Sequence, residues 1–130
     1  MKLHNRDILK FYTVDFRGKT LPLKLSFALK FNRDALKGAV TVYDQQRQEL
    51  INQYVEKDDE GKPVVRDNNY VMTSQDAWTK EMEELLDMEV EANIKTVDLE
   101  TLEKCDLQEF DTLTVEQIEA IYFMISEHAC

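Results

Sequence analysis

The stretch from Pro22 to Lys57, PLKLSFALKFNRDALKGAVTVYDQQRQELINQYVEK, decides the fold, because no proline interrupts it after its first residue. Apolar residues recur along it at intervals of three or four, the spacing of one face of an α-helix. Pro22 suits the first turn of a helix, where its missing N–H is not needed. We predict a single helix over about residues 22–57, roughly 50 Å long at 1.5 Å per residue. A helix of that length either projects from the chain or finds partners.

Two sides of this helix carry apolar side chains. The stripe that we expect to be buried consists of Leu25, Leu29, Asn32, Leu36, Ala39, Val40, Tyr43, Leu50 and Tyr54. Leu23, Phe27 and Phe31 lie well away from it, and we expect the N-terminal segment to cover them. After Gly38 the outer face becomes polar. We therefore look for a free functional surface from Asp44 to Lys57 and in the acidic turn that follows.

The segments on either side of the long helix predict shorter elements. Asn5 can cap a helix in the opening segment. Gly61 and Pro63 break the helical pattern, and two short apolar pieces then flank an Asp-Asn-Asn turn at Asp67. This arrangement predicts a β-hairpin over about residues 64–72, which must dock on another element to be stable.

The last part of the chain carries clear helix starts. Thr73 or Ser74 can cap a helix whose apolar stripe begins at Trp78. Alternating apolar and polar residues then predict a strand over about residues 90–97, and Asp98 can begin a short helical turn. Thr114 and Gln117 have the spacing of a capping box, which predicts a C-terminal helix.

Together these elements predict an α+β fold that is mostly helical, in one domain spanning residues 1–130. The long helix would pack antiparallel against the Trp78 helix and the C-terminal helix. The hairpin and the strand at about 90–97 would form one small antiparallel sheet at one end.

Charge is unevenly distributed along the 130 residues, whose formal net charge is −10. Residues 1–38 contain nine Lys and Arg against three Asp, whereas residues 39–130 contain seven Lys and Arg against 23 Asp and Glu. The acidic majority argues against direct binding of nucleic acid, which needs a basic surface. The basic first part is a candidate contact surface for an acidic partner.

Nothing in the sequence predicts a membrane or secretory location. No apolar run is long enough to span a bilayer, and charged residues occupy the place where a signal peptide is apolar. Cys105 and Cys130 are too few for a disulfide framework, so we expect reduced thiols. We expect a cytoplasmic protein that does not contact membranes.

The sequence offers no pattern of catalytic or ligand-binding residues. Glu81 and Glu84 are one turn apart but are expected to face solvent, where a general acid and base would not acquire different pKa values. His4 and His128 lie at opposite ends of the chain, far from rigid support for a metal or a nucleophile. We therefore predict no enzyme activity, no cofactor and no metal.

Exposed aromatic and polar residues, most of the polar ones acidic, are the candidates for binding a protein partner. Aromatic side chains that stay exposed in a monomer are typical anchors of protein interfaces. The predicted contact residues are Phe31, Asp44, Gln48, Asp58, Asp59, Glu60 and Tyr70.

Four segments of the chain carry a resemblance: MKLHNRD at 1–7, LPLKLSFA at 21–28, RQELI at 47–51 and EKDDEGKP at 56–63. Together they resemble a family of small proteins of unknown function from tailed phages and prophages of Gram-positive bacteria. The resemblance implies an origin and no active residues.

Taken with this origin, the long helix and the split charge predict a non-enzymatic phage or prophage protein. It would bind a viral or bacterial protein, either in virion assembly or by inhibiting a host factor in the bacterial cytoplasm. One alternative is an acidic inhibitor that mimics DNA and blocks a nuclease or defence protein. A structural homo-oligomer, and a small enzyme whose pocket forms only in the folded chain, are the others.

Overall fold

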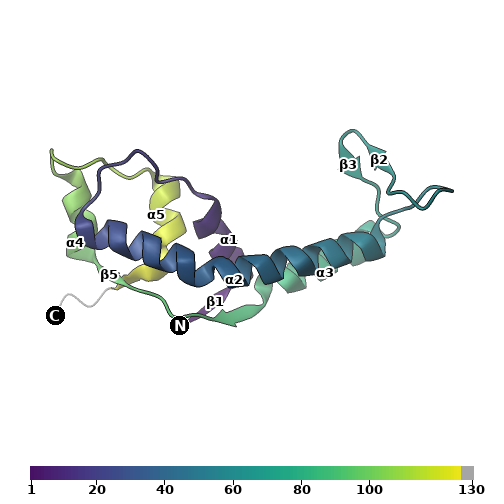
Figure 1. Cartoon of the computed structure of the whole chain (residues 1–130), viewed down its shortest axis with the longest axis horizontal. Coiled ribbons are helices and arrows are strands. Elements are labelled where there is room, and N and C mark those ends of the chain that lie inside the picture. Colours follow the sequence, from purple (N-terminus) through teal and green to yellow (C-terminus); the bar gives the residue numbers. More distant parts are fainter. Residues whose placement is uncertain (127–130) are drawn as a thin grey trace.

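Helix α2 (Leu23–Tyr54) runs through most of the length of the molecule in this computed structural model, which describes residues 1–126. Its first half lies in a globular part, which we call the head (Figure 1). Its second half continues outward beside α3 (Gln75–Asp87), and the hairpin of β2 (Val65–Arg66) and β3 (Asn69–Tyr70) stands to one side of its far end. We call residues 44–84 the arm. The fold is α+β and mostly helical, as predicted from the sequence.

The hydrophobic core lies in the head, where helices and strands from both ends of the chain meet. Its buried members are Leu3, Ile8, Phe11, Leu25, Ala28, Leu36, Val97, Cys105, Leu113, Ile121 and Met124. The predicted stripe of α2 faces this core, and Leu25, Asn32, Leu36 and Tyr43 are buried. Farther along α2, Ile51 is buried outside this cluster, so the arm relies on local contacts with α3.

The ends of α2 differ slightly from the prediction. Pro22 is the N-cap rather than a residue of the first turn, and its carbonyl accepts a bond from the backbone N–H of Ser26 at 3.0 Å. The helix ends at Tyr54 and not near residue 57, because Val55 is extended and residues 55–57 pair with the hairpin segment.

The described residues form three separate two-stranded sheets, and the predicted single sheet is therefore wrong. β1 (Lys2–His4) pairs antiparallel with β4 (Glu89–Glu91), and β2 pairs antiparallel with β3. β5 (Val97–Asp98) pairs parallel with β6 (Ile125–Ser126). The hairpin cannot join β4, because it lies at the far end of the arm (Figure 1).

The hairpin turns through Asp67 and Asn68, whose φ values are +52° and +66°. Two successive residues with positive φ are characteristic of a type I′ turn, and Asp and Asn tolerate this conformation better than most residues. The hairpin docks mainly through its backbone, since Glu56 N–H donates to Val71 O at 2.7 Å and Val64 N–H donates to Glu56 O at 2.8 Å. Its strand side chains are exposed.

Helix α1 (Asn5–Thr13) forms where a helix was predicted, but Asn5 is not its cap. His4 is the N-cap residue, and the Asn5 side chain is buried and donates to the carbonyl of Leu85 at 2.8 Å. The backbone N–H of Asn5 donates to Met88 O at 3.0 Å. Asn5 therefore ties the start of α1 to the end of α3.

The other helix starts follow the sequence closely. Ser74 caps α3, and Asp98 caps α4 (Leu99–Glu103). Thr114 and Gln117 form the predicted capping box of α5 (Val115–Ile121), with side-chain to backbone distances of 3.1 and 2.9 Å. Two 3-10 turns, η1 (Lys104–Asp106) and η2 (Tyr122–Met124), follow α4 and α5.

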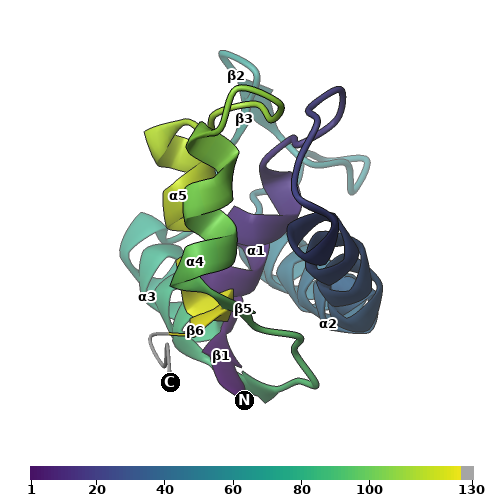
Figure 2. The ribbon, with the colours of Figure 1, turned by 90° about the vertical axis from the view of Figure 1, so that its left-hand side faces the viewer.

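The packing of α2 differs from the prediction at one point. α2 packs on α1 and α3, whereas α5 packs mainly on α1. Figure 2 shows α1 between α2 and the pair α4–α5. The rings of Phe11 in α1 and Phe123 in η2 meet edge to face, with centroids 5.4 Å apart.

Among the described residues, no helix combines the length and apolarity needed to cross a membrane. His128 and Cys130 lie outside these residues.

Candidate functional site

A row of large apolar side chains lies exposed on the first half of α2. Leu23, Phe27 and Phe31 are 84%, 57% and 38% exposed, and we call them the apolar ridge. Their spacing of four residues places each one turn after the last on the same side of the helix. The rings of Phe27 and Phe31 stack with centroids 6.1 Å apart. The expectation that the N-terminal segment covers these residues is wrong, because α1 packs against another side of α2.

A groove with a volume of about 460 Å³ runs along one side of the ridge. Leu23, Lys24 and Phe27 line it from α2, and the opposite wall is the extended segment from Lys95 to Asp98, with Thr101 behind it. Asn32, which is fully buried, fixes this wall. Its side-chain NH2 donates to Lys95 O at 2.9 Å, and its carbonyl oxygen accepts from Lys95 N–H at 2.7 Å. The groove is therefore held by hydrogen bonds and not only by packing.

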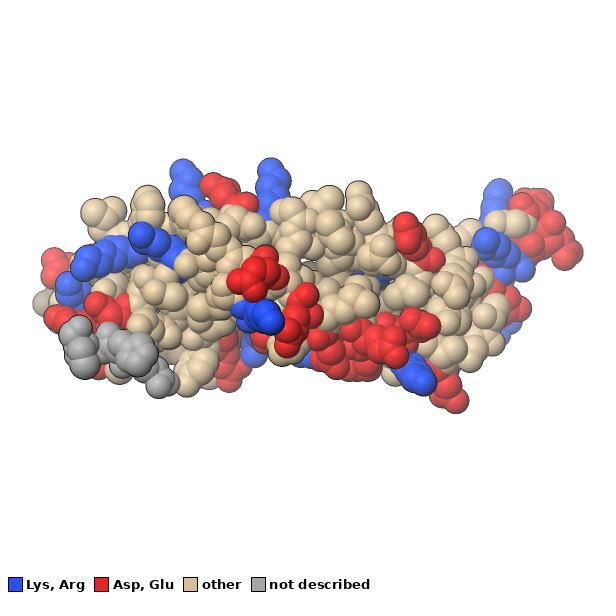
Figure 3. Space-filling model, turned by 90° about the horizontal axis from the view of Figure 1, so that it is seen from below, with Lys and Arg blue, Asp and Glu red and all other residues tan. Residues whose placement is uncertain are grey.

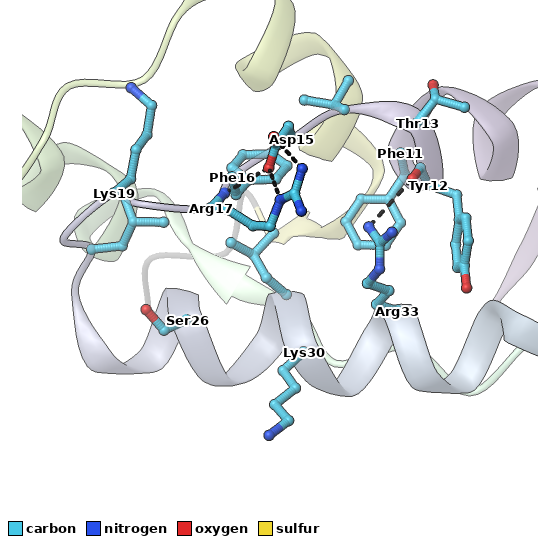
Figure 4. Close-up of a pocket in the computed structure, with 13 residues that line it drawn as sticks. Phe11, Tyr12, Thr13, Asp15, Phe16, Arg17, Lys19, Ser26, Lys30 and Arg33 are labelled. Carbon is cyan, nitrogen blue, oxygen red and sulfur yellow. Dashed lines mark hydrogen bonds and ion pairs between the residues drawn. The ribbon is translucent and has the colours of Figure 1, made fainter.

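A second pocket, of about 560 Å³, lies on the other side of α2, beneath residues 11–21 (Figure 4). Phe11, Phe16, Leu21 and Leu29 are among its apolar lining residues. The Arg33 guanidinium lies 4.4 Å from the centre of the Tyr12 ring and donates to the Tyr12 carbonyl at 3.3 Å. Both contacts hold Arg33 against the pocket wall.

The second arginine of this pocket is paired. Arg17 donates to both Asp15 oxygens, at 3.0 and 3.1 Å, and its backbone N–H also bonds Asp15. These hydrogen bonds from Arg17 lower the pKa of Asp15. Lys19 and Lys30 point away from the pocket in Figure 4. The pocket thus presents an apolar surface with one neutralised and one stacked arginine.

Lysines border the apolar ridge on both sides. Lys24 and Lys95 line the groove, and Lys30 lies next to Phe31. All three are exposed, and within residues 1–126 none of them is in a salt bridge. We call Lys24, Lys30 and Lys95 the lysine rim.

Asp98 is the carboxylate that lines the groove, and it is partly buried. It accepts the Thr101 backbone N–H at 2.7 Å. Hydrogen bonds from Thr101, followed by the charge of Lys24, lower the pKa of Asp98. Its charge is thus engaged in capping α4.

Acidic side chains gather elsewhere. Seen from below, they form a band over the middle of the molecule, where α3 and β4 lie (Figure 3). The exposed acidic residues of these two elements are Asp76, Glu83, Glu84, Asp87, Glu89 and Glu91. Arg6 donates to Glu83 at 2.8 Å and to Asp87 at 3.1 Å. The band is therefore partly neutralised where α3 meets α1.

The structure separates the predicted contact residues into two groups. Phe31 belongs to the apolar ridge, whereas Asp44 and Gln48 are exposed on the arm. Tyr70, 46% exposed, and the acidic turn lie past the end of α2. Phe31 and Tyr54 are separated by roughly 35 Å along the helix. The seven residues therefore do not form one surface.

The acidic turn, residues 58–60, has a structural role in the hairpin connection. One oxygen of Asp58 accepts the backbone N–H groups of Glu60 and Lys62, both at 2.9 Å. Gly61 adopts a φ of +79° within the same turn. Asp58 thus holds the reversal of the chain after α2, while Asp59 and Glu60 are exposed.

Leu23 and Phe27 are exposed residues of the apolar ridge that were not among the contact residues predicted from the sequence. Their four-residue spacing with Phe31, opposite the buried stripe, was visible in the sequence. The spacing does not show which side of α2 is covered by α1. The side that α1 covers determines whether Leu23 and Phe27 are exposed.

The other chemical candidates have structural partners. Glu81, expected to face solvent with Glu84, is instead partly buried and accepts the Tyr54 hydroxyl at 3.5 Å. Burial raises the pKa of the Cys105 thiol. Within residues 1–126, no three His, Cys, Asp or Glu side chains are placed to hold a metal ion.

Comparison with known proteins adds no relative. No family model, no curated protein and no solved structure matches the chain. The resemblance to small phage proteins therefore stays a prediction, and the functional argument rests on the surface itself.

Proposed function

We propose that this protein acts by binding another protein and has no enzymatic activity of its own. The observation that carries the proposal is the apolar ridge, where three large apolar side chains stand exposed in a row beside a groove with a fixed wall. Large exposed apolar side chains that lie together are typical of interaction sites.

The resemblance to phage and prophage proteins supplies the biological context of this proposal. The partner is then a viral protein in virion assembly or a host factor that the protein inhibits in the bacterial cytoplasm. Two copies of this chain could also meet through the ridge as a homo-oligomer. Mass measurements in solution separate these cases, because only self-association through the ridge gives a dimer that Phe27→Ser abolishes.

Site-specific photo-cross-linking tests the proposal. A photoreactive phenylalanine analogue replaces Phe27, and in a matched control it replaces Gln45. Gln45 lies on the same side of α2, five turns farther along, and is exposed. We expect a discrete adduct from position 27 in extracts of prophage-bearing cells and none from position 45. The purified partner should form the same adduct, and Phe31→Ser should remove it.

Two results would count against the proposal. Equal labelling from both positions would mean nonspecific contact, and no adduct from position 27 would mean that the ridge has no partner in these cells. Because Phe27 and Phe31 are exposed, these substitutions should leave the fold intact, which circular dichroism checks.

The acidic band on α3 and β4 favours a second candidate function, a DNA mimic. In that case Glu83 and Glu84 would occupy a nucleic-acid site on a nuclease or defence protein. Binding would then compete with DNA and weaken steeply with salt. Glu83→Gln with Glu84→Gln would abolish it, whereas Phe27→Ser would leave it unchanged.

A further inference from the structure

We propose that the apolar ridge receives an acidic amphipathic helix from a different protein. This inference rests on the proposed function and specifies the chemistry of the partner. It follows from the shape of the groove, from the charges around it and from the placement of the chain's own acidic helix.

The shape favours a helix over a strand. Leu23 to Phe31 covers nine residues, and the eight steps between them span about 12 Å along α2. Two turns of a facing helix match this length, with apolar side chains three and four residues apart. A strand would need free backbone groups in the wall. Both backbone groups of Lys95 are already bonded to Asn32, and β5 extends this wall by only two residues, which is too short an edge for an added strand.

The charges favour an acidic partner. The lysine rim has no salt-bridge partner among residues 1–126, and Lys37 is also exposed about two turns beyond Lys30 on α2. Two carboxylates stand near these lysines. Asp34 is exposed on α2, and Asp98 is held by the Thr101 amide. Asp and Glu side chains flanking the apolar positions of a partner would pair with the unpaired lysines.

A second copy of this chain does not supply such a helix. α3 is acidic and amphipathic, but its apolar residues Trp78, Met82 and Leu85 already lie partly or fully buried along α2. Most of the side chains that α3 exposes to solvent are carboxylates. The helix that packs on the ridge therefore comes from another protein. This helix must present an apolar face together with its acidic residues.

A nucleic acid fits this surface less well. Bases would stack on exposed aromatic faces, but Phe27 and Phe31 already stack on each other, and the outermost residue of the ridge is the aliphatic Leu23. The molecule also carries a net charge of −10, which opposes phosphate binding beyond the rim.

A displayed peptide library tests the inference with the full chain as bait. The peptides are helices of about 18 residues with Leu, Ile or Phe at positions spaced three and four apart. Glu, Lys, Gln and Ser occur equally at the other positions. We expect selected peptides to prefer Glu over Lys, and the best of them to lose at least tenfold in affinity with Phe27→Ser.

Charge variants complete the test. Lys24→Gln with Lys30→Gln should weaken the best peptide about tenfold and flatten its salt dependence. The matched control, Lys57→Gln with Lys62→Gln at the end of the arm, should change affinity less than twofold.

The possible failures are distinguishable. Peptides that need Phe27 but show no Glu preference would overturn the acidic partner and leave the proposed function standing. No selection, or binding that ignores Phe27→Ser, would count against both. An oligothymidine that binds tightly and is lost with Phe27→Ser would reassign the ridge to nucleic acid.

Discussion

Asn32 connects the stability of the head to the shape of the groove. It is fully buried on α2, and its side chain satisfies both backbone groups of Lys95. Asn32→Leu would leave that part-buried N–H and C=O without their partner, which costs up to about 1–3 kcal/mol for each group that stays out of water. We expect the free energy of unfolding to fall by about 2–4 kcal/mol, measured by urea denaturation.

The matched control is Asn52→Leu. Asn52 is exposed on the same helix and should change the free energy of unfolding by less than about 0.5 kcal/mol. Equal effects at the two positions would contradict the role of Asn32.

Asp98 should make stability depend on pH, because hydrogen bonds from Thr101 lower its pKa in the folded chain. Its stabilising contribution is present above its unfolded pKa, about 4, and is lost as pH falls through its lower folded pKa. Asp98→Asn keeps a capping oxygen but does not titrate. We therefore expect wild-type stability to fall more than that of Asp98→Asn between about pH 5 and pH 2. Parallel pH profiles from urea titrations would refute this.

At the scale of elements, the two glycines near the ends of the arm should respond oppositely to alanine. Gly38 lies within α2, and an added Cβ meets no atom within 4 Å. Gly38→Ala should raise the free energy of unfolding by about 0.5–1 kcal/mol, because alanine favours the helix. Gly61 has a φ of +79°, so Gly61→Ala should lower it by about 1 kcal/mol. Thermal unfolding of both variants shows whether each substitution stabilises or destabilises the fold. A lower stability of Gly38→Ala would contradict the open space around this position.

The two halves of α2 should open separately. Leu25, Ala28 and Leu36 belong to the core cluster, whereas the arm half packs mainly on α3 and lies outside this cluster. Hydrogen exchange followed by mass spectrometry should show earlier deuterium uptake in peptides from residues 44–54 than in peptides from residues 25–36. Uniform protection along α2 would contradict the division into head and arm.

Local patterns explain which elements were predictable. The stripe of α2, the Ser74 cap and the Thr114 capping box depend on neighbours a few residues away, and the structure confirms them. The strands β1 and β6 have three and two residues, too few for a periodic signal, and their partners are distant in the sequence. From the sequence, Asn5 is a candidate helix cap and Asn32 is a polar residue within the apolar stripe. In the structure their side chains bond to Leu85 and Lys95, which are far away in the sequence and which no local pattern identifies.

At the scale of the whole molecule, the fold arranges the uneven charge of the sequence in space. The apolar ridge and two residues of the lysine rim lie on the head half of α2, the third rim residue faces them from the segment before β5, and many of the acidic residues lie on α3 and β4. The sequence showed the charge division, and its predicted contact residues lie mostly on the arm, with Phe31 on the ridge. Exposure of the ridge depends on how α1, α2 and the segment before β5 assemble, which no local pattern contains.

The measurement that tests the central claim most directly is the affinity of a partner captured by the tagged wild-type chain. Its dissociation constant is measured for the wild type, for Phe27→Ser on the ridge and for Tyr70→Ser on the hairpin. Phe27 is 57% exposed and Tyr70 is 46% exposed, so each substitution replaces an exposed aromatic side chain with serine. We predict a loss of at least tenfold with Phe27→Ser and less than twofold with Tyr70→Ser. The reverse order would place the binding surface on the arm and contradict the account.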